Sequence, residues 1–236
     1  MLRDLKKVPA TRVAAEQVLQ QFRAKATVDS ARFVLENTGK PQVQFEAASA
    51  LKEAVIRQWS LMTPEQLDEV QRYTIAFVLH HAAGLATYVR EQLLLVVAVI
   101  VKGAWMATYA ARMGAMINDL VAKYQQAQHG DVPTKYAIAA LFLAVVKEFS
   151  STKASALGFT WEYHFQCRRG FETEALAQVF MFALNVLNDL LALPPTQLQQ
   201  QGSLFNACIG LAELILQWEF TGSGDAIEKK TFIFIT

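Results

Sequence analysis

Residues 63–78 read TPEQLDEVQRYTIAFV, and this stretch indicates the fold of the whole chain. Thr63 can cap a helix, Pro64 suits the first helical position, and Gln66 completes a capping box with Thr63. Side chains that can be buried then recur on a single helical face, at Leu67, Val70, Thr74, Phe77 and Val78. The stretch therefore predicts a helix that must bury one side against a neighbour.

The same pattern occurs on both sides of this helix, and no convincing alternation of period two appears before the last few residues. The preceding stripe is Phe45, Ala48, Leu51, Val55 and Trp59, and a late stripe is Leu204, Cys208, Leu211, Ile215 and Trp218. Turn-forming residues separate the helical segments at 37–41, 129–133 and 193–195. The chain is predicted to consist of helices joined by short breaks.

Large aromatic residues close the long apolar helices at a regular interval. Trp105 follows Trp59 after 46 positions, and Phe149 follows Trp105 after 44. HEAT and armadillo units are about 40–47 residues long, and they stack because one helix pair cannot bury its own apolar face. We predict an all-α, right-handed α-α superhelix of the HEAT/ARM type with about four and a half helix pairs, in units near 10–39, 41–80, 85–127, 132–193 and from 203.

Three segments fit this pattern poorly. The insertion Ser150–Arg169 starts with small polar residues and is expected to form a partly packed loop. The stretch Gly103–Gly114 is rich in Ala, Gly and Met, which puts a helix there in doubt. We expect the solenoid to cover residues 1–220, and the pattern then breaks into an irregular tail at 221–236, which suggests a truncated product or fragment.

Composition excludes several classes of protein. The formal net charge is only +1, which argues against a nucleic-acid-wrapping protein. The longest apolar run, Leu93–Val101, is nine residues against the roughly 20 that a membrane span needs, so a buried core helix is expected. Two distant cysteines, Cys167 and Cys208, and the lack of a secretory leader favour a reducing, intracellular location.

No motif supports catalysis, a cofactor or a metal. Gly222-Ser223-Gly224 lacks the Lys and Ser or Thr of a phosphate-binding loop, and the GxSxG pattern is missing. His80 and His81 are adjacent on a helix and point about 100° apart, so they cannot easily share an ion. His164 and Cys167 have metal-like spacing but lack further ligands nearby. The chain is therefore not predicted to be an enzyme.

Four segments carry a family resemblance. Ala14–Phe22 (AAEQVLQQF) and Gln44–Trp59 (QFEAASALKEAVIRQW) resemble the N-terminal domain of the importin-β/exportin superfamily of nuclear transport receptors. Tyr88–Lys102 (YVREQLLLVVAVIVK) and Lys147–Ser151 (KEFSS) resemble its exportin 4 family. The importin-β-like part covers about residues 10–80 of the solenoid.

This resemblance implies a receptor that shuttles between nucleus and cytoplasm. Its partners would be the small GTPase Ran in its GTP form, Phe-Gly nucleoporins and protein cargo. The exportin 4 likeness implies the hypusine-bearing translation factor, Smad3 and Sox-type transcription factors as that cargo. No cofactor, direct nucleic-acid contact or membrane insertion is implied. Trp59, Trp105 and Trp218 could line Phe-Gly pockets, although core packing explains them better.

In this superfamily, Ran contacts lie on the inner, second helices of the first repeats. The candidate Ran-binding residues are accordingly Asp29, Arg32, Glu36, Glu65, Asp68, Glu69, Arg72, Asp119 and Lys123. For any single one of them, ordinary surface solvation is the better explanation, and only the cluster as a whole points to a partner. Two functions remain open: the Ran-binding arch of a transport receptor, and a HEAT-repeat scaffold or inactive truncated form without Ran-dependent transport.

Overall fold

A computed structural model describes residues 7–128, 130–150 and 157–220. Within these ranges the chain is helical and contains no strand, as predicted. The helices are α1 (Lys7–Lys25), α2 (Val28–Asn37), α3 (Pro41–Gln58), η1 (Trp59–Leu61), α4 (Pro64–His80), α5 (Thr87–Gly103), η2 (Trp105–Tyr109), α6 (Ala110–Gln126), α7 (Val132–Ser150), α8 (Trp161–Glu174), α9 (Leu176–Leu191), α10 (Pro195–Gln200) and α11 (Gly202–Leu216).

The start of α4 is the one that the sequence predicts. The Thr63 side chain accepts a hydrogen bond from the Gln66 backbone N–H, and the Gln66 side chain accepts one from the Thr63 N–H. Such reciprocal capping satisfies backbone donors that the first helical turn leaves unpaired. All five predicted stripe positions of α4 are buried, and so are the five of the late stripe that runs from Leu204 to Trp218.

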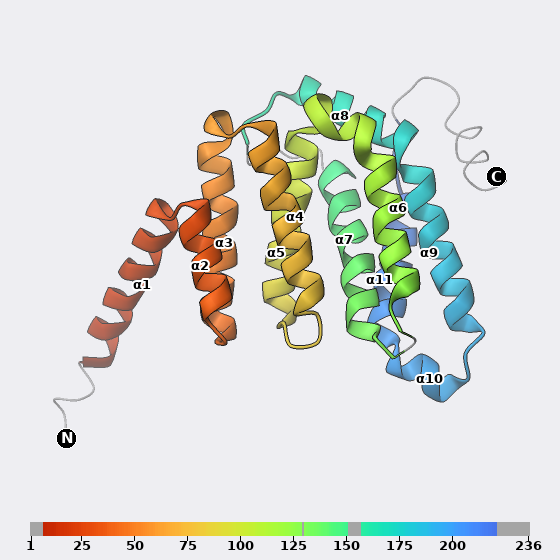
Figure 1. The fold of residues 1–236 in the computed structure, drawn as a ribbon, viewed down its shortest axis with the longest axis horizontal. Helices are drawn as coiled ribbons and strands as arrows, with labels where there is room; N and C mark the ends of the chain where they lie inside the picture. Colours follow the sequence, from red (N-terminus) through yellow and green to blue (C-terminus); the bar gives the residue numbers. More distant parts are fainter. Residues whose placement is uncertain (1–6, 129, 151–156, 221–236) are drawn as a thin grey trace.

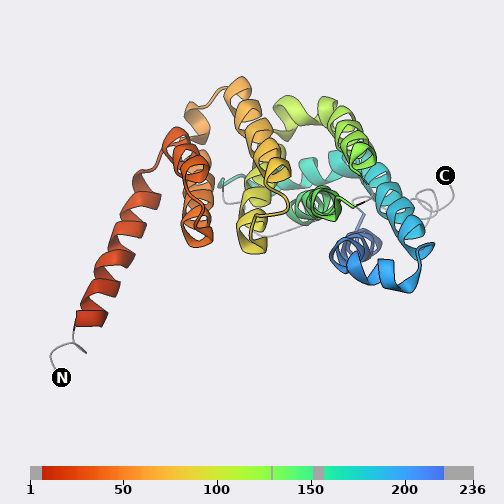
Figure 2. The same cartoon turned by 60° about the horizontal axis from the view of Figure 1, so that its bottom comes forward.

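Consecutive antiparallel helices form two layers (Figures 1 and 2). The first helices α3, α5, α7 and α11 pack side by side, and each second helix, α2, α4 and α9, packs on a first helix. Helix α1 packs on α3 and extends away from the rest (Figure 1). This stacking confirms the all-α solenoid, with α10 as a short additional helix between α9 and α11.

Helix α5 is the centre of the core. Between Leu93 and Val101 every residue except Leu95 is buried, because α3 packs on one side and α7 on the other. Among the described residues, no single helix is long and apolar enough to cross a membrane. Two bent pairs, α5 with 105–126 and α8 with α9, reach the required length and composition only when taken together.

The expectation of a loop at Ser150–Arg169 is wrong for its second half. Residues 151–156 lie outside the described ranges, but α8 begins at Trp161, where the Thr160 side chain accepts a hydrogen bond from the Tyr163 backbone N–H. Figure 1 shows α8 crossing the ends of the other helices. Local composition missed this helix because about half of the residues in its first turns are polar. Its buried side packs on aromatic residues that lie far away in the sequence.

Those aromatic residues include Trp105 and Phe149, two of the three that recur along the sequence. The rings of Trp105 and Phe149 lie 5.0 Å apart, Phe149 and Phe171 4.4 Å, and Phe171 and Trp218 6.1 Å. Trp105 and Trp218 are almost fully buried, which confirms core packing for both, whereas Trp59 is half-buried against Gly103. Trp105, Phe149 and Trp218 thus form one cluster with Phe171 of α8.

The doubt about a helix at Gly103–Gly114 was also misplaced. A π-helical turn, Trp105–Tyr109, leads directly into α6. The wider turn places Trp105 and Tyr109 in the core, where both are buried. Tertiary packing of these two rings outweighs the weak local preference of the Gly- and Ala-rich sequence.

Candidate functional site: a charged groove on the second helices

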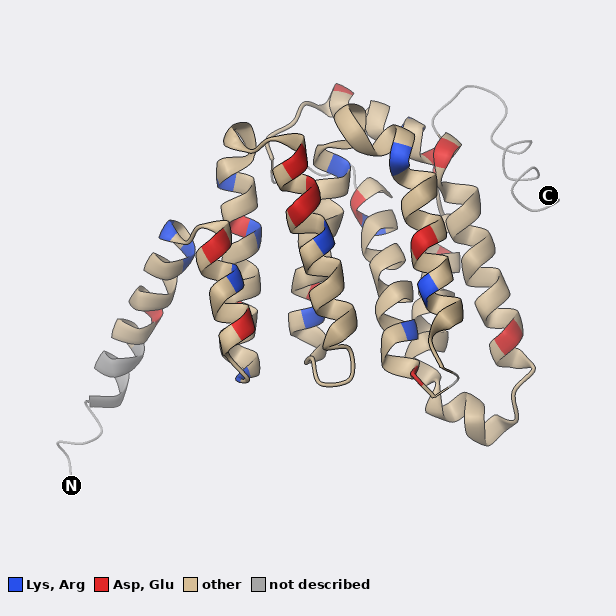
Figure 3. Ribbon diagram, in the orientation of Figure 1, with Lys and Arg blue, Asp and Glu red and all other residues tan. Residues whose placement is uncertain are grey.

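The nine predicted Ran-binding residues all lie on three second helices. Asp29, Arg32 and Glu36 are on α2, the group from Glu65 to Arg72 is on α4, and Asp119 and Lys123 are on α6. Figure 3 shows charged positions on all three of these helices. The structure groups six of the nine into ion pairs.

The first ion pair joins α2 to α4. A guanidinium nitrogen of Arg32 lies 3.0 Å from a carboxylate oxygen of Glu69. The same guanidinium stacks 4.1 Å above the ring centre of Tyr73, a cation–π contact that holds the Arg32 side chain flat against α4. Candidate residues from the first two hairpins therefore form one continuous surface.

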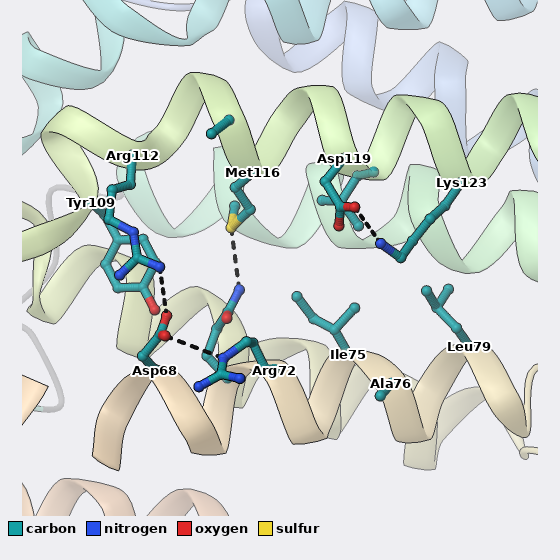
Figure 4. A pocket seen from close by; sticks show the side chains of 13 residues that line it. Asp68, Arg72, Ile75, Ala76, Leu79, Tyr109, Arg112, Met116, Asp119 and Lys123 are labelled. Atoms are coloured by element: carbon teal, nitrogen blue, oxygen red, sulfur yellow. Dashed lines mark hydrogen bonds and ion pairs between the residues drawn. The ribbon is translucent and has the colours of Figure 1, made fainter. Parts of the chain in front are cut away.

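Asp68 joins α4 to α6. Its carboxylate lies 3.2 Å from Nε of Arg72 and 3.4 Å from Nη2 of Arg112, as Figure 4 shows. Asp68 is mostly buried whereas both arginines are exposed, so the carboxylate is fixed and the two cations have freedom to move. Arg112 was missed because it falls in Gly103–Gly114, where no reliable helix was expected.

Between α4 and α6 lies a groove of about 430 Å³, which we call the charged groove. The Asp68 cluster lies at one end and the Asp119–Lys123 ion pair, one turn apart on α6, lies toward the other (Figure 4). The apolar part of its lining comes from Ile75, Ala76, Leu79, Met116 and Leu120. The groove thus presents charges of both signs around an apolar strip.

Two further polar groups line the charged groove. The Gln71 amide donates a hydrogen bond to Sδ of Met116 at 3.3 Å, which links α4 to α6. Burial, together with the nearby Asp68 carboxylate, raises the pKa of Tyr109 above its usual value. The Tyr109 hydroxyl has no hydrogen-bond partner within the described ranges, so it is a spare donor beside Asp68. Neither residue stood out in the sequence, because each looks like an ordinary helix residue.

Three candidates remain outside the ion pairs. Asp29 and Glu36 are exposed on α2, and Glu65 is exposed in the first turn of α4. Hydrogen bonding to its own backbone N–H and to Thr63 lowers the pKa of Glu65, which suits a helix start. These three residues extend the charged surface but do not line the groove.

The Exportin-4 family model matches residues 5–235, almost the entire chain. The chain belongs to the Exportin-4 family. The resemblance of Ala14–Phe22, Gln44–Trp59 and the later segments to nuclear transport receptors is therefore confirmed. Exportin-4 family membership supports a general role in transport between nucleus and cytoplasm.

Exportin-4 proteins are transport receptors, a role that depends on surfaces that bind other molecules. Among the described residues, no group of three or more His, Cys, Asp or Glu side chains could hold a metal ion. His164 and Cys167 lie instead on the buried side of α8, where the Cys167 thiol donates a hydrogen bond to the Lys102 carbonyl at 3.7 Å. Burial raises the pKa of Cys167 to about 11, which keeps the thiol protonated and unreactive near neutral pH.

Proposed function

We propose that this chain forms the Ran-binding arch of a nuclear transport receptor and that the second helices α2, α4 and α6 contact Ran in its GTP form. One observation supports this most directly. The residues chosen from sequence lie on one face that crosses three consecutive hairpins, joined by Arg32–Glu69 and Asp68–Arg112. A protein partner that touches this face contacts several hairpins at once.

The charged groove also suits a reversible contact. Exposed ion pairs contribute about 0–1 kcal/mol each, so Arg72, Arg112 and Lys123 can exchange their present partners for groups on a bound protein at little cost. Such exchange alters how neighbouring hairpins are held together. Binding of Ran-GTP then changes the spacing of the solenoid and, by linkage, its affinity for cargo.

The remaining parts of the proposal follow from family membership. The cargo is protein, with the hypusine-bearing translation factor, Smad3 and Sox-type factors as candidates, and Phe-Gly nucleoporins carry the receptor through the pore. The receptor accordingly shuttles between nucleus and cytoplasm. Support for these partners comes from membership of the Exportin-4 family and from no single residue.

Capture on immobilised Ran tests the proposal. The chain should bind Ran loaded with a non-hydrolysable GTP analogue and should not bind Ran-GDP. A variant with Asp68→Asn and Glu69→Gln should lose most of this capture, because it removes the two carboxylates that face α6 and α2. Glu213→Gln on α11 is the matched control, since Glu213 is exposed and lies off the second-helix layer.

The alternative function makes a different prediction for the same experiment. A HEAT-repeat scaffold without Ran-dependent transport, or an inactive truncated form, captures neither nucleotide state of Ran. Equal binding to both states, or unchanged capture by the double variant, contradicts the proposal as well.

A further inference from the structure

A second groove opens on the same layer, between α6 and α9. It measures about 320 Å³ and its lining contains one charged residue, Asp189. Four side-chain carboxamides line it instead: Asn118 and Gln125 on α6, and Gln178 and Asn185 on α9. We call it the amide groove. Its chemistry differs from that of the charged groove, which has five charged residues in its lining.

The four carboxamides have unused hydrogen-bonding capacity. Within the described part of the chain, Asn118, Gln125 and Asn185 make no side-chain hydrogen bond, and Gln178 makes only a long one of 3.5 Å to the Glu174 carbonyl. All four residues are exposed. Each carboxamide offers a donor and an acceptor side by side, which is the complement of one peptide group.

The order of the carboxamides along the groove is regular. Helices α6 and α9 both run from the α8 end of the molecule toward the α10 end (Figure 1). Gln178 is level with Gly114, because a Cβ on Gly114 would lie 3.9 Å from the Gln178 amide nitrogen. With a rise of 1.5 Å per residue, Asn118 follows about 6 Å further along, Asn185 at about 10.5 Å and Gln125 at about 16.5 Å.

The carboxamides therefore alternate between the two walls at steps of roughly 5 Å. An extended peptide repeats its orientation every two residues, or about 6.7 Å, and points successive peptide groups to opposite sides. Carboxamides on the same wall are about 10.5 Å apart, so a bound segment meets them at only some of its peptide groups, and the flexible Asn and Gln side chains reach the nearest ones. A span of about 16.5 Å corresponds to about five residues of extended chain.

The floor of the groove is apolar. Val121, Phe182 and Val186 line it, and the Tyr124 ring packs edge-on against Phe182 at 5.2 Å. Alternate side chains of an extended segment would rest on this floor while the others face solvent. At the α10 end, the exposed carboxylate of Asp189 can pair with one cation of the ligand.

We propose that the amide groove binds an extended segment of about five residues from a partner protein. The carboxamides of Asn118, Gln125, Gln178 and Asn185 hydrogen-bond its main chain, and Asp189 pairs with a Lys or Arg of the segment. An extended segment is favoured over a helix because a helix has no spare main-chain groups for the carboxamides. Nucleic acid is disfavoured since the lining has no cation and Asp189 repels phosphate.

The test uses the full 236-residue chain without Ran, so that its result is independent of the Ran-binding proposal. The probes are acetylated, amidated hexapeptides with one terminal Lys and the other positions varied among Ala, Ser, Thr, Val and Leu. Dissociation constants of fluorescent members are measured by anisotropy. We expect members that bind in the micromolar range, and failure of every member to bind more tightly than about 1 mM overturns the proposal.

Variants then assign the site. The double variant Asn118→Ala with Asn185→Ala should weaken binding of the best peptide about tenfold or more, because it removes one carboxamide from each wall. Asn188→Ala is the matched control: Asn188 is exposed on α9 and lies outside the groove lining. Equal weakening by the control and the double variant contradicts the assignment.

The peptide backbone supplies the last comparison. N-methylation of alternate peptide groups in the best hexapeptide should abolish binding, because it removes main-chain donors and leaves every side chain in place. Replacing Asp189 with Asn should remove the preference for Lys over norleucine at the terminal position. Unchanged binding of the N-methylated peptide shows that side chains alone are recognised and overturns main-chain recognition.

Discussion

The carboxylate of Asp68 on α4 lies 3.4 Å from Nη2 of Arg112 on α6. This contact lies at one end of the charged groove and joins two hairpins that make few other contacts through their second helices. Because Arg112 is about half exposed, solvent screens the pair, and it can open when a partner binds.

A double-mutant cycle of Asp68→Asn and Arg112→Gln should give a small coupling free energy. We expect a stabilising coupling free energy of about 0.5 kcal/mol in low salt, falling toward zero in 0.5 M NaCl. Urea unfolding of the four proteins measures it. A coupling above about 2 kcal/mol would mean that the pair is a structural lock and not an exchangeable contact.

Gly170→Ala should destabilise the chain by about 1–3 kcal/mol. A Cβ at Gly170 would lie 2.6 Å from Nε1 of Trp105, and this indole is buried and cannot move aside. Gly210→Ala, within α11, is the control, because a Cβ at Gly210 would meet only Cδ2 of Leu143, at 3.9 Å. That control should be neutral or slightly stabilising, since Ala favours a helix over Gly. Thermal denaturation compares the two, and equal midpoints would refute the steric explanation.

Phe171→Ala should cost about 3–5 kcal/mol of unfolding free energy. Phe171 is fully buried and contacts Trp105, Phe149 and Trp218, so its loss opens a cavity under α8. The comparison is Phe165→Ala, which affects a half-buried ring on the same helix and should cost clearly less. The midpoint of urea unfolding reports both values. Similar losses for both would show that α8 is not held by the aromatic cluster.

The buried thiols should make stability depend on alkaline pH. Burial raises the pKa of Cys208 from 9.0 to about 12, so the folded state holds this proton more tightly than the unfolded chain does. The associated stability is complete below about pH 9 and is lost as the pH rises toward 12. The free energy of unfolding of the wild-type chain, measured relative to that of Cys208→Ala, should therefore be lower at pH 10.5 than at pH 7.5. At pH 8, iodoacetamide should label Cys208 slowly until urea is added, and rapid labelling without urea would contradict burial.

Local signals in the sequence were enough for the helical framework. The Thr63–Gln66 capping box places the start of α4, and the stripe from Leu67 to Val78 gives its buried side, because both depend on residues within a few turns of each other. The spacing of Trp59, Trp105 and Phe149 indicated the repeat for another reason, because each helix pair of a solenoid uses a similar length of chain. The candidate residues of α2, α4 and α6 could also be chosen, since their position in a repeat follows from the helix order.

Only the tertiary structure decided which of these residues meet. α8 forms because Gly170 and Phe171 reach a cluster built from residues far apart in the sequence, and composition alone made its segment look like a loop. The pairing of Asp68 with Arg112 and the alternation of Asn118 with Asn185 depend on the distance and rotation between separate helices. Local pattern fixes what each helix buries, but the packing of side chains between helices sets their relative placement and therefore the grooves.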